Sequence, residues 1–226
     1  MSEVSERATI GARGADLARL VAIVPVRTLE GSKSRLGGSL DAEERQGLVR
    51  LLLERTIEAA RLAPGIASVL VVSPDPEILD LASAAGAAAL EQRGEGLNEG
   101  LDEAVRQATA EGASAVLVLA ADLPSISAAS IGEIVTTAAA AATAGRAIVV
   151  VVPDRHGRGT NALLLSPPDA IGFAFGVDSR IAHEAAARAV DALSLEVDGP
   201  LSLDLDLPED LTLAEERGLL DPAHGG

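Results

Sequence analysis

The 226-residue sequence predicts an α/β fold, a single-domain three-layer α/β/α sandwich with a mostly parallel, mixed central sheet. Aliphatic runs alternate with helical segments of ten or more residues, which is the pattern of βαβ units. Several of these runs are continuously apolar, as expected for parallel strands that are buried on both faces. Since no Pro-, Gly- or Ser-rich linker divides the chain, we expect a flexible N-terminus (1–19), one domain (20–218) and a C-terminal tail (219–226).

Strands are predicted wherever the aliphatic runs occur. The clearest run is "LVAIVPV" (Leu20–Val26), which is rich in β-branched residues. Similar runs predict strands over 66–75, 87–91, 113–122, 146–154, 160–167 and 193–199. In "LSLDLDL" (Leu201–Leu207) apolar and polar residues alternate, and this period of two predicts a half-buried strand that closes the sheet.

Helices are predicted between these strands from apolar residues at helical spacing. The segments lie over 41–63, 76–86, 97–112, 125–145, 178–192 and 208–218. Asp41 is a plausible N-cap of the first helix, because its side chain can accept a hydrogen bond from a free backbone N–H. Gly86 is expected to end the second helix.

The composition excludes several classes of function. Hydrophobic residues make up 48% of the chain and aromatic residues only 1%, so the core must be built from Ala, Val, Leu and Ile. A net charge of −16 argues against a nucleic-acid or anionic-membrane partner. The absence of cysteine excludes disulfides and thiolate sites. Because no secretory leader and no apolar run near 18 residues is found, we expect a cytoplasmic protein.

The loop after the first strand, "VPVRTLEGSKSRL", carries a cluster of cations. Arg27, Lys33 and Arg35 surround Gly31 and Ser34. Backbone N–H groups and cations can together bind a triphosphate at such a strand end. The loop matches neither the Walker A pattern nor Gly-x-Gly-x-x-Gly. An exposed basic loop on an acidic protein is the alternative interpretation.

Three aspartates are candidate metal ligands. Asp122 ends a buried strand, where the ligand edge of an open α/β sheet lies. Asp204 and Asp206 share one face of the alternating segment. If that segment lies beside Asp122, the three carboxylates converge, and oxygen ligands of this kind suit Mg²⁺. The alternatives are a turn-initiating Asp122 and a solvated edge strand.

Polar residues also flank the sixth strand and the fifth helix. Thr160 and Asn161 begin the strand, and Gly176 and Ser179 precede the helix, whose N-terminus would attract an anion. The alternative for Ser179 is a simple N-cap. The three histidines have no Ser or Cys partner in a recognisable nucleophile motif, so a Ser-His-Asp hydrolase is not expected.

Taken together, the motifs resemble the guanylyltransferases of coenzyme F420 biosynthesis, which act on 2-phospho-L-lactate or phosphoenolpyruvate. The resemblance runs in order from about Val21 to Leu211, and its most specific parts are "KSRL", "GTNALLL" and "LDLDLPEDL". It implies a fold like that of the nucleotide-diphospho-sugar transferases. It further implies transfer of GMP from GTP to phosphoenolpyruvate, which releases pyrophosphate and forms enolpyruvoyl-2-diphospho-5'-guanosine.

The resemblance also implies roles for individual residues. Nucleotide contacts fall to Arg27, Lys33, Ser34, Arg35, Ser73, Gly96, Leu97 and Asn98. The acceptor contacts fall to Thr160, Asn161, Gly176 and Ser179. The ligands of Mg²⁺, or of Mn²⁺ as a substitute, are Asp122, Asp204 and Asp206, with Lys33, Arg35 and Asp122 as the catalytic set. Arg27 departs from the lysine expected at its position, which keeps the charge but changes its shape.

Other functions stay open at this stage. The same transfer to 2-phospho-L-lactate or 3-phosphoglycerate is an alternative, as is a molybdopterin or sugar-phosphate acceptor. A catalytically inactive nucleotide-binding module belongs to a different class, and the three aspartates disfavour it. The expected partners are the two small substrates and the next enzyme of the F420 pathway, which would receive the product.

Overall fold

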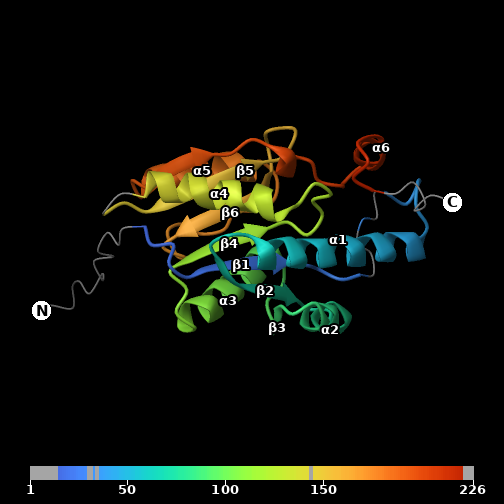
Figure 1. Cartoon of the computed structure of the whole chain (residues 1–226), viewed down its shortest axis with the longest axis horizontal. Coiled ribbons are helices and arrows are strands. Elements are labelled where there is room, and N and C mark those ends of the chain that lie inside the picture. Colours follow the sequence, from blue (N-terminus) through green and yellow to red (C-terminus); the bar gives the residue numbers. More distant parts are fainter. Residues whose placement is uncertain (1–14, 30–32, 34–35, 143–144, 221–226) are drawn as a thin grey trace, which may run out of the picture.

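The computed structural model describes residues 15–29, 33, 36–142 and 145–220, and it has three layers (Figure 1). A seven-stranded sheet in the order β3-β2-β1-β4-β6-β5-β7 forms the middle layer. Its strands are β1 (Leu20–Pro25), β2 (Ile66–Ser73), β3 (Ala88–Glu91), β4 (Ala115–Leu119), β5 (Ile148–Pro153), β6 (Thr160–Ser166) and β7 (Leu193–Glu196). The predicted single-domain α/β fold with a mixed sheet is therefore confirmed.

One strand runs against all the others. β1 pairs in parallel with β2 and β4, β2 with β3, and β5 with β7, whereas β6 is antiparallel to both β4 and β5. The pairing of Leu119 with Ala162 brings the start of β6 beside the end of β4. As a result, the first residues of β6 lie at the same sheet edge as the residues that follow β1 and β4.

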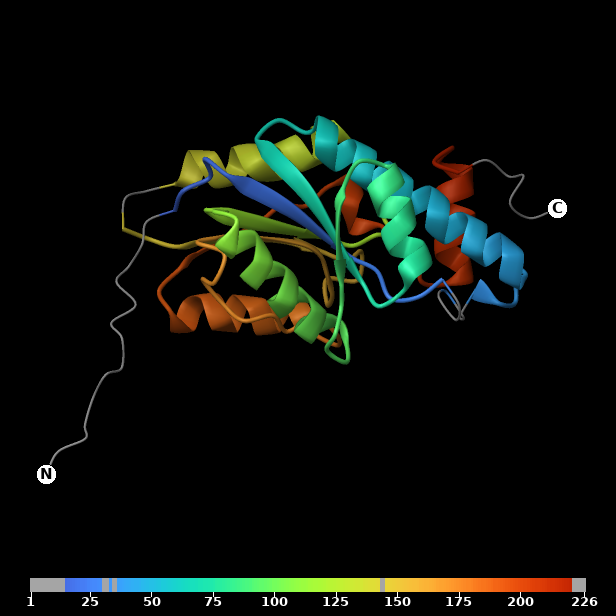
Figure 2. The ribbon, with the colours of Figure 1, turned by 90° about the horizontal axis from the view of Figure 1, so that it is seen from below.

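Helices cover both faces of the sheet (Figure 2). Apolar residues of α1 (Ala42–Leu62), α2 (Pro76–Ala84) and α4 (Ala128–Ala141) pack on one face. Those of α3 (Leu97–Ala110) and α5 (Ser179–Ala189) pack on the other. Within the described part of the chain, no helix has the length and apolar character needed to cross a membrane.

The double coverage explains the continuously apolar strands. In β1, Leu20, Ala22 and Val24 join the core beneath α1 and α4. Val21 and Ile23 point to the opposite face and join the core beneath α3. Because side chains of a strand alternate between faces, a strand with helices on both sides must be apolar throughout.

The predicted helix boundaries have local causes. Asp41 caps α1, since its carboxylate accepts from the backbone N–H of Glu44 at 2.9 Å, and Glu44 in turn accepts from the N–H of Asp41 at 2.7 Å. A reciprocal cap of this kind typically contributes about 1 kcal/mol. Gly86 follows α2 with a φ of 83°, a left-handed conformation that glycine adopts without strain.

The strand predicted over 201–207 is not formed. A short 3₁₀ turn at Pro200–Ser202 is followed by an extended segment outside the sheet, which we call the acidic segment (residues 203–207). A backbone hydrogen bond from the N–H of Leu205 to the carbonyl of Asp122, at 3.1 Å, links it to the end of β4. Leu203 and Leu205 are buried against the N-terminal half of α1 and α6 (Pro208–Glu216). The alternating pattern thus correctly predicted which side chains are buried, but a β-strand also needs backbone hydrogen bonds to an adjacent strand.

Candidate active site

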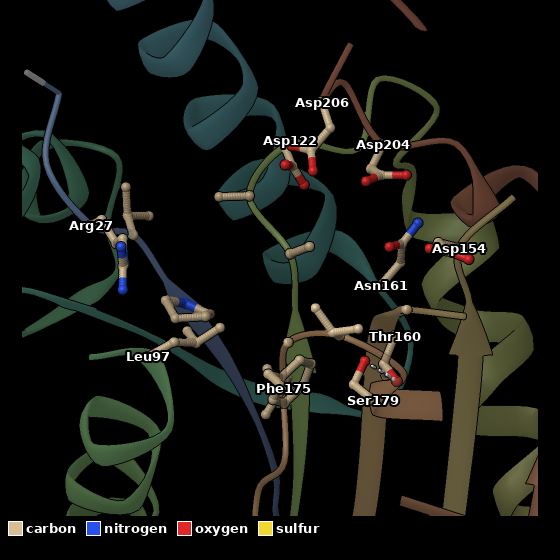
Figure 3. Close-up of a pocket in the computed structure, with 18 of the residues that line it drawn as sticks. Arg27, Leu97, Asp122, Asp154, Thr160, Asn161, Phe175, Ser179, Asp204 and Asp206 are labelled. Carbon is tan, nitrogen blue, oxygen red and sulfur yellow. Dashed lines mark hydrogen bonds between the residues drawn. The ribbon is translucent and has the colours of Figure 1, made fainter. Parts of the chain in front are cut away.

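A cavity of about 1080 Å³ opens at the sheet edge where β1 and β4 end and β6 begins. We call it the active-site cavity. The close-up shows residues that line it arriving from separate elements (Figure 3). Arg27 follows β1, Asp122 follows β4, and Thr160 begins β6. In open α/β sheets this edge is where ligands bind, because successive loops diverge there and leave a crevice.

Three carboxylates meet at one side of the cavity. Oxygens of Asp122, Asp204 and Asp206 lie within 4.8 Å of one another. Asp204 and Asp206 come from the acidic segment, and all three carboxylates point toward a shared space (Figure 3). The structure therefore brings together the three candidate metal ligands, although Asp122 is separated from the other two by more than 80 residues in the sequence. Their role as ligands stays a prediction.

A lysine ammonium lies among these carboxylates. Lys33 Nζ donates to Asp122 and, at 3.1 Å, to Oδ1 of Asp206. Burial by itself would lower the pKa of Lys33, but Coulomb attraction to both aspartates and the two hydrogen bonds together raise it. Lys33 is therefore charged and offsets part of the carboxylate charge. Its expected neighbours in the nucleotide loop, Ser34 and Arg35, lie outside the described residues.

Asp204 is the carboxyl group of the three whose pKa is clearly raised. Burial raises its carboxyl pKa to about 6, and repulsion from Asp122 and Asp206 adds to the shift. A carboxyl group with such a pKa is only partly stabilised in its charged form by Lys33. An additional cation between the three side chains would restore that stabilisation.

The acidic segment is held in place by Asp210, a residue of α6 that sequence reasoning did not select. Its Oδ2 accepts from the backbone N–H groups of Asp206 and Leu207, at 3.0 and 2.7 Å. Its Oδ1 lies 2.6 Å from Nη2 of Arg155, close enough for an ion pair although it is not aligned as a hydrogen bond. Asp210 is 2% exposed. The quoted motif "LDLDLPEDL" contained it, but only the fold shows which carboxylate turns inward.

The predicted acceptor residues extend from Asn161, which lies beside Asp204, to the pair Thr160 and Ser179 at the other end of the cavity, which we call the acceptor end (Figure 3). Thr160, Asn161, Gly176 and Ser179 all line the cavity. The Asn161 amide donates to the carbonyl of Leu201 at 2.9 Å, so it also supports the chain that leads into the acidic segment. Ser179 Oγ and Thr160 Oγ1 are hydrogen-bonded at 3.2 Å, which places two hydroxyl groups side by side (Figure 3).

The predicted nucleotide residues divide into two groups. Arg27, Lys33 and Leu97 line the cavity, whereas Ser73, Gly96 and Asn98 are outside its lining. Ser73 is buried, and its hydroxyl donates to the carbonyl of Arg27 at 2.7 Å. Ser73 thus holds the backbone that carries the Arg27 side chain.

Asn98 likewise supports a wall of the cavity. Its amide donates to the carbonyl of Phe175 at 3.2 Å, and its Oδ1 accepts from the N–H of Phe175 at 2.9 Å. This paired contact ties the start of α3 to the loop that carries Gly176. Gly96 is the N-cap of α3, with a φ of 102°.

Sequence reasoning missed the residues that the β5–β6 turn brings to the cavity. Asp154, His156 and Arg158 all contribute to its lining. Arg158 Nε donates to Oδ1 of Asp178 at 2.7 Å, and both residues line the cavity. The polar sequence "PDRHGRG" was the available signal. Its importance follows only from the antiparallel direction of β6, which turns this hairpin toward the ligand edge.

The fold resembles that of solved nucleotidyltransferases. A nucleotidyl transferase from Methanothermobacter thermautotroptrophicus superposes with a TM-score of 0.60 at 16% identity, covering 89% of this chain and 98% of that one. A 4-diphosphocytidyl-2C-methyl-D-erythritol synthase from Anaerococcus prevotii superposes with a TM-score of 0.61 at 11% identity, with 91% and 98% coverage. At such identities the likeness concerns the fold.

Sequence comparison then gives the family. The family model "Guanylyl transferase CofC like" matches residues 20–215, and the chain belongs to this family. The phosphoenolpyruvate guanylyltransferase of Rubrobacter xylanophilus is 45% identical over 198 residues, covering 87% of this chain and 94% of the relative. That of Sphaerobacter thermophilus is 45% identical over 197 residues, with 84% and 90% coverage. The resemblance drawn from the sequence is confirmed.

Proposed function

We propose that this guanylyltransferase transfers GMP from GTP to the phosphate of phosphoenolpyruvate and releases pyrophosphate, as a step of coenzyme F420 biosynthesis. The observation that carries the proposal is the convergence of Asp122, Asp204 and Asp206 with Lys33 at one cavity. A cavity of about 1080 Å³ has room for a nucleotide and a small acid. The relatives at 45% identity bear the same name for their reaction.

The three carboxylates fit a divalent metal ion. They offer only oxygen atoms, which are the ligands that Mg²⁺ prefers, and Mn²⁺ accepts the same donors. Burial and repulsion from Asp122 and Asp206 raise the pKa of Asp204 despite the attraction of Lys33, and a further cation at this position would oppose that shift. We therefore propose that Asp122, Asp204 and Asp206 hold Mg²⁺, with Mn²⁺ as a substitute. When bound, this ion would neutralise charge on the phosphates of GTP.

The chain's own cations address the same electrostatic problem. An acceptor phosphate and a triphosphate are both anionic, so their approach requires positive charge on each side. Arg27 and Lys33 line the cavity near the ends of β1 and β4, where we place the GTP phosphates. Arg158 lies at the acceptor end and can exchange its contact with Asp178 for a contact with the acid.

No general base is needed in this mechanism, because the attacking phosphate oxygen already carries charge at neutral pH. The buried His183 is not placed to act as a base, since both of its ring nitrogens are hydrogen-bonded to groups of the protein. The work of the site is to bind two anions and to orient them for in-line attack.

The proposal extends to the surroundings of the reaction. GTP and a phosphorylated three-carbon acid are cytoplasmic metabolites, so we propose that the enzyme acts in the cytoplasm. Its product contains a diphosphate bond to an enolpyruvoyl group and is a substrate for a further transfer. We propose that the next enzyme of the pathway receives it.

Pyrophosphate release tests the reaction directly. The protein is incubated with Mg²⁺, each of the four nucleoside triphosphates, and phosphoenolpyruvate, 2-phospho-L-lactate or 3-phosphoglycerate. We expect release with GTP and phosphoenolpyruvate. Faster release with another acid would overturn the acceptor, faster release with another nucleotide would overturn GTP, and no release from any pair would overturn the transfer reaction.

A matched pair of variants tests the metal site. Asp122→Asn removes one charge from the carboxylate trio and is expected to lower turnover by a factor of about 100 or more, the usual order for loss of an electrostatic contact at the reacting atoms. Asp80→Asn removes the same charge from an exposed position of α2 and should leave turnover unchanged. Equal turnover of the two variants would remove Asp122 from the site.

A further inference from the structure

His183 is a fully buried histidine of α5 that contacts the acceptor end of the cavity through one hydroxyl group. Its side chain is 0% exposed, and the edge of its ring meets Phe175 with a centroid separation of 4.9 Å. Both ring nitrogens have partners. Nδ1 lies 3.1 Å from Oγ1 of Thr160, and Nε2 accepts from the backbone N–H of Ala174 at 3.1 Å.

These two contacts determine which nitrogen carries the hydrogen. A backbone amide can only donate, so the N–H of Ala174 requires Nε2 to be the unprotonated nitrogen. Neutral imidazole carries one hydrogen, which must then be on Nδ1. Burial lowers the pKa of His183 to about 4, so the ring is neutral at physiological pH. His183 therefore donates from Nδ1 to the oxygen of Thr160.

The direction of this bond decides what the neighbouring hydroxyl groups can offer. Thr160 and Ser179 have one hydroxyl hydrogen each, and one of the two is used in the bond between them. Because Thr160 receives a hydrogen from His183, neither hydroxyl has to donate to the ring. The second hydroxyl hydrogen stays available, and both residues line the cavity.

The opposite tautomer would remove this donor. If Nδ1 were unprotonated, Thr160 would donate to His183 and Ser179 would donate to Thr160. Both hydroxyl hydrogens would then be used inside the protein, and the cavity would face lone pairs only. Lone pairs repel an anion, whereas an O–H group directed at a carboxylate or phosphate oxygen forms a charge-assisted hydrogen bond.

We propose that His183 is a positioning residue that makes the Thr160–Ser179 hydroxyl pair a hydrogen-bond donor toward the anionic acceptor. The proposal rests on the proposed function, since it concerns how the phosphorylated acid is held. His183 does not touch the acid itself. Its second contact, with Ala174, holds the loop that carries Gly176, so one ring orders two parts of the acceptor end.

Steady-state kinetics of two variants tests the proposal. His183→Leu fills a similar volume but gives Thr160 no hydrogen, so the direction of the available O–H is no longer fixed. We expect the KM for phosphoenolpyruvate to rise about threefold, less than for complete loss of a hydrogen bond to a charged group. The KM for GTP should change little. His183→Asn keeps an N–H group near the position of Nδ1, so it should recover part of the affinity for the acid.

A double-mutant cycle separates positioning from a general structural role. In a Thr160→Val background the hydroxyl that receives the His183 hydrogen is gone, so His183→Leu should add almost nothing to the KM for phosphoenolpyruvate. Where turnover of the double variant is too slow, calorimetric binding of phosphoenolpyruvate in the presence of Mg²⁺ gives the same comparison. Ile134→Val, a core change on the opposite face of the sheet, controls for lost stability.

The outcomes are distinct. If His183→Leu raises the KM for the acid equally with and without the Thr160 hydroxyl, or raises the KM for GTP to the same extent, the inference is wrong. If His183→Asn is no better than His183→Leu, the donor at Nδ1 is not the relevant feature and the inference is also wrong. Absence of pyrophosphate release by the wild-type protein would instead overturn the proposed function.

Discussion

Replacing Asp210 with alanine tests how the acidic segment is held at the cavity. The carboxylate of Asp210 accepts from the N–H groups of Asp206 and Leu207 and pairs with Arg155 at 2.6 Å. Removing it leaves two backbone donors without their acceptor, at about 1 kcal/mol each. The ion pair is buried on the Asp210 side and 28% exposed on the Arg155 side, so its loss costs about 2 kcal/mol, less than for a fully buried pair.

The expected loss of unfolding free energy is therefore about 4 kcal/mol, a large part of the roughly 5–15 kcal/mol typical of a domain. For a chain of this size that corresponds to a fall of roughly 12 °C in Tm. Turnover should fall by about a hundredfold in the folded fraction, because Asp204 and Asp206 lose their fixed position and a misplacement near 1 Å has effects of this order. Denaturant unfolding and pyrophosphate release measure the two effects.

Two further variants make the result interpretable. Asp210→Asn keeps an oxygen that can accept from the backbone but removes the charge that Arg155 requires, so its stability should lie between those of the wild type and Asp210→Ala. Glu209→Ala removes the same charge from an exposed position one residue earlier in α6 and should change stability by less than about 0.5 kcal/mol. If Asp210→Ala lost less than 1 kcal/mol and kept full turnover, packing of the leucines would be sufficient to hold the segment and our reasoning would fail.

Three other predictions follow from single contacts. The pKa of His183 is about 4 in the folded protein and near 6.5 in the unfolded chain. The unfolding free energy should therefore fall by about 3 kcal/mol as the pH is lowered from 6.5 to 4, because the unfolded chain binds the proton first. In His183→Asn the unfolding midpoint should depend less steeply on pH over this range. Asp204 is protonated as the pH falls below about 6, so the affinity for the proposed Mg²⁺ should drop by up to about tenfold for each further pH unit. Calorimetric affinities that do not depend on pH would contradict the role of Asp204 as a ligand. Gly65→Ala should destabilise by more than about 1 kcal/mol, since φ is 88° and the new Cβ would lie 2.9 Å from Cγ1 of Val135; an unchanged Tm would refute this.

The kind of fold and the ends of most elements could be predicted from local patterns. Continuous aliphatic runs such as Leu20–Val26 indicated strands buried on both faces, and helices were found on both sides of β1. Asp41 and Gly86 mark helix ends by their own chemistry, a side-chain cap and a left-handed φ. These features depend on a few neighbouring residues, so the sequence carries them directly.

The acidic segment shows where local patterns end. Its alternation correctly indicated which leucines are buried, but the segment pairs with no strand among the described residues and forms an extended loop instead. A sheet ladder is a contact between distant parts of the chain, so periodicity in one segment cannot establish it. The two aspartates nevertheless share a side, because burial of Leu203 and Leu205 directs the residues between and after them toward the cavity.

The sequence by itself therefore determined the fold class, the family, and the chemical types present at the site: carboxylates, cations and hydroxyl groups. Only the tertiary structure decided what each of them contacts. It placed Asn98 and Ser73 as supports of the cavity walls, turned Asp210 inward to hold the acidic segment, and brought Arg158 to the acceptor end through the reversed direction of β6. The reason is physical: the identity of a side chain sets what it can donate or accept, whereas its partner is set by packing of residues far apart in the chain.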